Sequence, residues 1–361
     1  MSETKPAVRY CKGDDGKSIA WMSIGSGPPT VVCQWGGALF AQTLRLPGTP
    51  TLSEDLRRGR TVVRYDGRGT GLSDRDFDDI SIETVVKDVE AVVAAAGLDR
   101  FALYAGESSC HPAIHYAARH PERVTQLVLC SGFVQGFMVR NSPGRAARGA
   151  AVLAVLETGL NDQNPGVRLM NLAHLYPNAT PDEVAALQEF QRTAFTGRQL
   201  ARFQRSTATS DVSMLAPQVR CPTLVVHPSR DVRNPLEEGR RLATLIPGAR
   251  FRPVDSDNYR PVPSDPAWQE AVREIQEFFD GDAQAGGQRA PFADLTPRQR
   301  DVLELLARGL DNLQIAAHLA LAEKTVRNTI TPIFEKLAVE SRPQAIVRAR
   351  EAGFGAARGP G

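Results

Sequence analysis

Five short apolar runs, alternating with turns and helical patterns, constrain the fold of this chain more than any other feature of its sequence. They are Thr30–Gln34, Thr61–Tyr65, Phe101–Ala105, Gln126–Cys130 and Thr223–His227. The runs are rich in valine and leucine and mostly lack polar alternation, so they fit strands that are buried on both faces. Valines at helical spacing fill the stretch between the second and third runs until Gly97 ends the pattern. Strands that alternate with helices predict an α/β fold with a doubly wound parallel sheet.

A break in composition predicts two domains. Residues 281–292 are small, polar and glycine-rich, as expected of a flexible linker. The preceding residues 1–280 are enough for an α/β domain, and within them residues 135–215 show no convincing strand and are expected to form a helical cap. The following residues 293–361 fit a small helical domain.

The composition excludes several classes of protein. The chain of 361 residues has 43 lysines and arginines against 41 aspartates and glutamates, so its charge is too small for a protein that coats nucleic acid by charge alone. Five scattered cysteines without a Cys-x-x-Cys pair argue against a disulfide scaffold or a zinc site, and no metal or cofactor is expected. No apolar run is long enough for a signal peptide or a membrane span, so we expect a cytoplasmic protein.

A strand that passes through a sharp turn into a helix is predicted at residues 101–112, where Gly106 and Cys110 flank Ser108 two residues away on either side. A serine between small residues at such a turn is typical of a nucleophile elbow. The plain alternative is an ordinary strand-to-helix turn rich in serine. Asp231 follows a later strand-like run, at the place where the acid of a catalytic triad would lie.

These segments, in this order, resemble the α/β-hydrolase family over residues 8–280, and most of all its ester- and lactone-cleaving members with a helical cap. The resemblance implies that Ser108 is the nucleophile, Asp231 the acid and Gly37 an oxyanion-hole donor. It places the triad histidine at the position where this chain has Tyr259.

The missing histidine decides the predicted function, because none of the six histidines lies within residues 228–317. A serine hydroxyl needs a base with a pKa near 7, whereas tyrosine, with a pKa of ~10, stays protonated at neutral pH. His111 is a less favoured substitute base. We therefore predict a vestigial triad of Ser108, Asp231 and Tyr259 without turnover, in which Tyr259 donates a hydrogen bond to Asp231. The expected ligand-binding residues are Trp35, Gly37, Ser108, Ser109 and Tyr259.

Four helices are predicted within residues 295–354 from their start and stop signals. Three pairs have the spacing of capping boxes, and they are Thr296–Gln299, Asp311–Gln314 and Ser341–Gln344. The second helix is followed by a short turn at residues 320–322 and by a longer helix that begins at Glu323. This arrangement predicts a helix-turn-helix.

The longer helix has one apolar stripe and one polar face. Its apolar residues recur at helical spacing and are expected to face the domain core; they are Val326, Ile330, Ile333 and Leu337. Outside this stripe lie two cations and two short polar side chains, which are Lys324, Arg327, Thr325 and Asn328. Such a face suits the major groove of DNA, and the alternative is the solvated face of a protein-docking module.

The whole segment closely resembles the LuxR/GerE-type DNA-binding domain of bacterial transcription regulators. The resemblance implies base or phosphate contacts from those four polar residues, a phosphate contact from Lys336, and binding as a homodimer to a two-fold operator in double-stranded DNA. Two positions depart from the pattern. Ala322 stands where the family commonly has a serine cap, whose loss costs about 1 kcal/mol. Pro332 lies inside the recognition helix and is expected to kink its second half.

The two halves together predict a ligand-responsive transcription regulator, in which a small-molecule effector bound in a degenerate hydrolase pocket modulates operator binding. The hydrolase resemblance implies an ester, lactone or carboxylate with an apolar body as the effector. One alternative is a slow esterase or lactone hydrolase with a DNA-binding tail. Another is a non-enzymatic scaffold that binds no ligand.

Overall fold

The computed structural model describes residues 7–35, 58–77, 79–140, 165–194, 196–286, 297–319, 321–337 and 341–351, together with a few single residues between these ranges. Its chain forms two compact units, Met1–Phe279 and Asp280–Gly361, each with a hydrophobic core of its own. In the described part of the chain, no helix combines the length and the apolar character that crossing a membrane requires.

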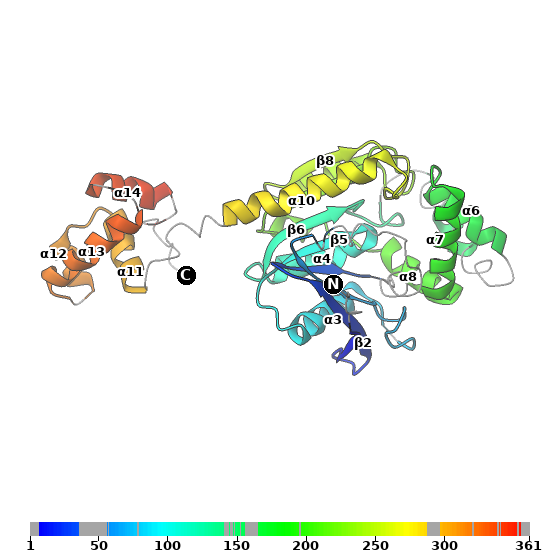
Figure 1. Ribbon diagram of the computed structural model, residues 1–361, viewed down its shortest axis with the longest axis horizontal. Coiled ribbons are helices and arrows are strands. Elements are labelled where there is room, and N and C mark those ends of the chain that lie inside the picture. Colours follow the sequence, from blue (N-terminus) through cyan, green and yellow to red (C-terminus); the bar gives the residue numbers. More distant parts are fainter. Residues whose placement is uncertain are drawn as a thin grey trace, which may run out of the picture. The chain divides into compact units, whose positions relative to one another are not determined.

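An eight-stranded sheet forms the centre of the first unit, with the strand order β1-β2-β4-β3-β5-β6-β7-β8 (Figure 1). The five apolar runs of the sequence are all strands of this sheet. They are β3 (Pro29–Cys33), β4 (Thr61–Tyr65), β5 (Phe101–Gly106), β6 (Val124–Cys130) and β7 (Thr223–Pro228). Neighbouring members of this set pair in parallel, which confirms the predicted α/β fold.

Three further strands extend the sheet at its two edges. The antiparallel strands β1 (Arg9–Lys12) and β2 (Ser18–Gly25) lie beside β4, and β8 (Arg250–Val254) pairs in parallel with β7. The outermost strands β1 and β8 are mostly exposed and carry charged residues, as edge strands commonly do. Because of their polar composition, these two strands do not form apolar runs in the sequence.

Helices cover both faces of the sheet. On one face, α3 (Ile82–Ala95), α4 (Cys110–Arg119) and α9 (Leu236–Leu245) pack into the same apolar cluster as the strands. On the other face, α10 (Pro266–Gly286) lies along the sheet and contributes its apolar residues to a second cluster (Figure 1). The helix α10 continues to Gly286 and so extends into the first six residues of the predicted linker at 281–292.

The cap between β6 and β7 is helical in the part that the structure describes. Its helices are α6 (Pro165–Leu175), α7 (Pro181–Ala194) and α8 (Gly197–Ala208), which gather at one end of the sheet (Figure 1). A capping box of Thr196 with Gln199 begins α8. One isolated bridge between Gln135 and Asp211 joins the two ends of the cap.

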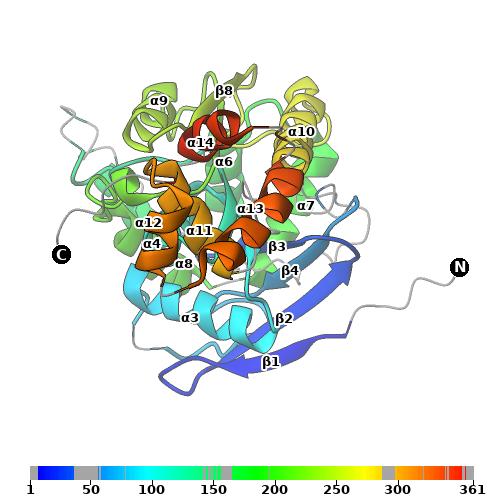
Figure 2. The ribbon, with the colours of Figure 1, turned by 90° about the vertical axis from the view of Figure 1, so that its left-hand side faces the viewer.

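Where the structure describes residues 297–351 of the second unit, it shows four helices, α11 (Pro297–Ala307), α12 (Asn312–His318), α13 (Glu323–Leu337) and α14 (Arg342–Glu351), labelled in Figure 2. The predicted capping box of Asp311 with Gln314 is present at the start of α12. Thr296 lies outside the described residues. Pro332 lies inside α13, and the helix continues beyond it to Leu337.

Candidate functional site

The carboxyl ends of four parallel strands meet at one edge of the sheet. The strand registers place Gly106 of β5 beside Cys130 of β6, Cys130 beside Val226 of β7, and Pro228 of β7 beside Val254 of β8. The segments that follow these strands therefore lie next to one another, as at the ligand-binding edge of other open α/β sheets. Glu107, Asp231 and Tyr259 all come from these segments.

Glu107, not Ser108, occupies the strained position of the elbow. β5 ends at Gly106, and Glu107 follows with a φ of 59°, a left-handed value that non-glycine residues rarely adopt. The nucleophile of a hydrolase elbow sits at such a strained residue, and here that residue is Glu107, one position before the predicted Ser108. Small residues also flank Glu107 at a distance of two, namely Ala105 and Ser109, so the sequence is compatible with the elbow in either register.

Ser109 and Trp35 connect the elbow to the end of β3. The backbone N–H of Trp35 donates to the Ser109 hydroxyl oxygen at 2.9 Å, and the Trp35 indole N–H donates to the carbonyl of Ile80 at 3.2 Å. Trp35 is only 2% exposed, and its ring packs edge-on against Phe203 of α8. Both residues were predicted to contact ligand, and that remains a prediction; in the structure they are hydrogen-bonded to each other. Gly37 lies outside the described residues.

Two arginines lie near the elbow, Arg260 beside the Glu107 carboxylate and Arg233 beside Tyr259. The Arg260 Nε lies 3.7 Å from Glu107 Oε1 and also donates to the Tyr176 hydroxyl at 3.2 Å. Arg233 places its guanidinium over the ring of Tyr259, 5.3 Å from the ring centre. The Glu107 and Arg260 side chains are 27% and 43% exposed, so this part of the site is open to solvent.

Tyr259 is held between the end of the sheet and the cap. Its backbone N–H donates to the carbonyl of Leu175 at 2.7 Å, and its side chain packs with the apolar cap residues Leu172 and Leu187. Burial, reinforced by the charge of Glu107, raises the pKa of Tyr259 well above 10. The phenol therefore stays protonated at neutral pH and cannot act as a base.

Asp231 is a buried carboxylate with one oxygen that lacks a partner. Its Oδ1 accepts the backbone N–H groups of Arg233 at 2.8 Å and of Asn234 at 3.1 Å, whereas Oδ2 has no partner among the described residues. The expected hydrogen bond from Tyr259 to Asp231 is therefore not formed. Burial raises the pKa of Asp231 to about 7, although the two backbone donors and Arg233 favour the charged form.

Two histidines close to the site in sequence are tied to backbone carbonyls inside the domain. His111 Nε2 lies 2.8 Å from the carbonyl oxygen of Phe133, and burial lowers its pKa to about 4. His227 Nε2 lies 2.8 Å from the carbonyl oxygen of Asn234, and burial lowers its pKa as well. Because both imidazoles are committed to these contacts, neither fills the place of the missing base.

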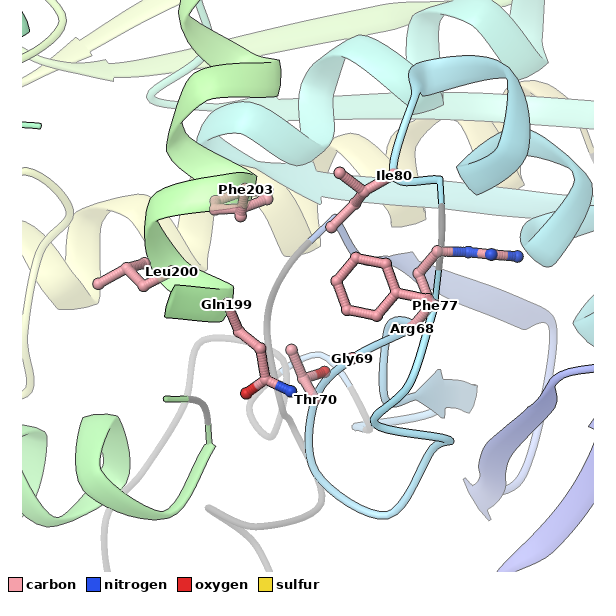
Figure 3. A pocket seen from close by; sticks show the side chains of 8 residues that line it. All are labelled: Arg68, Gly69, Thr70, Phe77, Ile80, Gln199, Leu200 and Phe203. Carbon is pink, nitrogen blue, oxygen red and sulfur yellow. The ribbon is translucent and has the colours of Figure 1, made fainter. Parts of the chain in front are cut away.

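A separate pocket lies between α8 and the segment that follows β4 (Figure 3). It is a small, partly open pocket lined by Arg68, Gly69, Thr70, Phe77, Ile80, Gln199, Leu200 and Phe203. Arg68 points its guanidinium away from the pocket and toward Asp88, with two hydrogen bonds of 2.7 Å. Gln199 takes part in the capping box of α8. Because these polar groups are already bonded, the pocket offers mainly apolar contact.

The four predicted DNA-contacting residues near the start of α13 share one exposed face. Lys324, Thr325, Arg327 and Asn328 are all exposed, whereas Val326, Ile330 and Ile333 are buried in the core of the unit. Arg327 pairs with Glu323 one turn earlier, at 2.9 Å. The side chains of Lys336 and Leu337 lie outside those that the structure describes.

Comparison with known proteins assigns both parts of the chain. Residues 45–259, more than half of the chain, match the family model described as the alpha/beta hydrolase fold. The chain belongs to the α/β hydrolase fold family. Residues 293–349 match the bacterial regulatory proteins of the luxR family, so this hydrolase-fold protein carries a C-terminal LuxR-type helix-turn-helix domain.

Individual relatives resemble one part of the chain at a time. The probable HTH-type transcriptional regulator GfsR of Streptomyces halstedii is 45% identical over 62 residues, which are 17% of this chain and 26% of that protein. The putative carbamate hydrolase RutD of Klebsiella pneumoniae is 27% identical over 198 residues, or 52% of this chain and 70% of that protein. The chain spans about a quarter to a third of the length of the regulators that it matches first.

Solved structures share the fold of the first unit at low sequence identity. The enol-lactonase from Burkholderia xenovorans has a TM-score of 0.62 and 19% identity, with 75% of this chain and 100% of that chain covered. The esterase from Exiguobacterium antarcticum has a TM-score of 0.62 and 18% identity, with 77% and 100% covered. At this level of identity the likeness concerns the fold and not the reaction.

Proposed function

We propose that this protein is a ligand-responsive transcription regulator whose hydrolase-fold domain binds a small molecule without turning it over. The observation that carries the proposal is the replacement of the catalytic set at the sheet edge. Glu107 stands at the strained elbow position, and a protonated Tyr259 stands where the family has its histidine. A serine hydrolase that lacks its nucleophile and its base keeps only the small residual catalysis of binding and oxyanion contacts.

Ligand recognition without turnover suits a sensor, because the signal persists for as long as the ligand is bound. The helix-turn-helix unit supplies the output, with the exposed face of α13 as the DNA-contacting surface. A ligand shifts operator binding only if it binds the DNA-competent and DNA-incompetent states with different affinity. The protein is expected to act as a homodimer on a two-fold operator, because helix-turn-helix regulators commonly read two half-sites.

Operator binding by the full-length protein, with and without ligand, tests the proposal. An operator is selected from genomic fragments, ligands are found by a thermal-shift screen, and affinity is measured by fluorescence anisotropy at fixed salt. We expect a bound ligand to change the operator affinity at least fivefold in one direction. Arg327→Ala, as a control, should weaken operator binding without changing the ligand affinity. A ligand-saturated protein whose operator affinity stays the same would contradict the proposal.

A slow esterase or lactone hydrolase with a DNA-binding tail is the second candidate, favoured by the esterase and the enol-lactonase among the fold neighbours. It predicts multiple turnovers of p-nitrophenyl acetate or a simple lactone by the purified protein. That activity should then be lost in Ser108→Ala or Glu107→Ala. Under the regulator proposal, neither substitution changes a rate that is already close to the background.

A further inference from the structure

The charges around the elbow balance one another. The carboxylates of Glu107 and Asp231 are accompanied by the guanidinium groups of Arg233 and Arg260. A site with this balance attracts neither an anion nor a cation strongly over a distance. The charge pattern therefore favours a neutral ligand.

The Glu107 carboxylate also disfavours the ligand that a hydrolase elbow usually receives. In an esterase, the elbow residue faces the carbonyl carbon while backbone N–H groups receive the carbonyl oxygen. A carboxylate at this position places negative charge next to the partly negative oxygens of an ester, a lactone or a carboxylate. Glu107 is thus better suited to a group that donates a hydrogen bond than to one that accepts it.

Asp231 provides the second acceptor. Its side chain is only 4% exposed, and Oδ2 has no hydrogen-bond donor among the described residues. A buried acceptor without a partner costs roughly 1–3 kcal/mol, so such atoms in folded proteins commonly mark the place of a ligand or a water molecule. Oδ1 is already held by two backbone N–H groups, which fix the orientation of the carboxylate.

We propose that the site binds a neutral, hydroxyl-bearing ligand, with the ligand hydroxyl donating a hydrogen bond to Oδ2 of Asp231. The inference rests on the proposed function in that it names the ligand class of the same site. Such a ligand differs from the ester, lactone or carboxylate that the hydrolase resemblance implies.

Four probes with the same ring and different polar groups test the inference on the full-length protein. They are cyclohexanol, cyclohexanone, cyclohexylamine and cyclohexanecarboxylate, and binding is measured by ligand-observed NMR titration at pH 8. We expect cyclohexanol to bind about tenfold more tightly than each of the other three, because only the neutral donor satisfies Asp231 without adding charge.

Asp231→Asn sharpens the test, because it keeps the shape of the side chain and reverses its hydrogen bonding. The asparagine Oδ1 can still accept the two backbone N–H groups, which leaves the Nδ2 donor in the place of Oδ2. The variant should therefore prefer cyclohexanone to cyclohexanol. Asp257→Asn, which removes a half-buried carboxylate paired with Arg230, should leave the wild-type order of affinities unchanged.

Three results would overturn the inference. They are a wild-type preference for any of the other three probes, an order of affinities that Asp231→Asn leaves unchanged, and failure of cyclohexanol to bind at its solubility limit. The proposed function fails separately. If the hydroxyl preference holds and no ligand alters operator binding, the ligand class stands and the regulator proposal falls. If operator binding responds only to esters or carboxylates, the regulator proposal stands and the ligand class is wrong.

Discussion

Replacing Asp231 with asparagine should stabilise the first unit, and by more at high pH than at low pH. Burial raises the pKa of Asp231 from 3.8 to about 7 in the folded protein. An acid with a raised pKa holds its proton more tightly in the folded state, so folding stability falls as the pH rises between about 4 and 7. Asparagine keeps the acceptor for both backbone N–H groups and carries no charge. The stability of the variant therefore does not fall as the pH rises.

The size of the effect follows from the two pKa values. At pH 8 the carboxylate is charged in both states, and the difference between 3.8 and about 7 corresponds to roughly 4 kcal/mol. At pH 5 the destabilisation is only roughly 2 kcal/mol, because the Asp231 carboxyl is still protonated in the folded protein. The stabilisation by Asp231→Asn should therefore be about 2–3 kcal/mol larger at pH 8 than at pH 5.

Tryptophan fluorescence measures this effect on the hydrolase-fold unit alone, because Trp21, Trp35 and Trp268 all belong to it. Thermal unfolding is followed at both pH values for the wild type and the variant. For a unit of this size, the expected difference in Tm gain between pH 8 and pH 5 is roughly 4–12 °C.

A Tm gain of Asp231→Asn that does not depend on pH, or a loss of stability of this variant at pH 8, would refute the reasoning. Asp257→Asn is the matched control, because the hydrogen bond from Arg230 lowers the pKa of this carboxylate. Its stabilising contribution appears above the unfolded pKa and is lost as the pH falls through the folded pKa. The control variant Asp257→Asn should therefore show no gain in Tm at pH 8.

Three further predictions concern strain, a buried ion pair and DNA contact. Glu107→Gly should raise the free energy of unfolding by about 1 kcal/mol in the same fluorescence assay, because glycine adopts the left-handed φ of 59° without strain; a destabilised variant would argue against strain at the elbow. Asp88→Asn should lower stability by roughly 3–5 kcal/mol in a urea titration, because it leaves the buried Arg68 guanidinium without its bidentate partner; a change below 1 kcal/mol would contradict this. Lys324→Ala should weaken operator binding and reduce its salt dependence in anisotropy titrations, with Tm unchanged; an unaltered salt slope would exclude a phosphate contact.

Much of the architecture follows from local patterns in the sequence. Valine-rich runs such as Thr61–Tyr65 form the central strands, because a strand buried on both faces needs apolar residues on both. The capping box of Asp311 with Gln314 begins α12 where the pattern predicts it, since both of its hydrogen bonds lie within four residues. The apolar stripe of α13 is likewise buried as expected at Val326, Ile330 and Ile333.

Local patterns are less informative where partners distant in sequence decide the outcome. The edge strand β8 carries two arginines and a proline, and only its pairing with β7 makes it a strand. His111 was a possible base by its distance in sequence from Ser108, yet its hydrogen bond to Phe133 and its burial commit it to the interior. Neither result follows from residue spacing.

The sequence by itself determined that a strand, a sharp turn and a helix would follow one another near residue 106, because small residues flank the turn in two possible registers. Only the tertiary structure decided between them. The pairing of β5 with β6 extends β5 to Gly106, and the turn then places Glu107, rather than Ser108, at the left-handed position. The missing partner of Asp231 Oδ2 was decided in the same way, because burial and hydrogen bonding depend on atoms brought together from the whole domain.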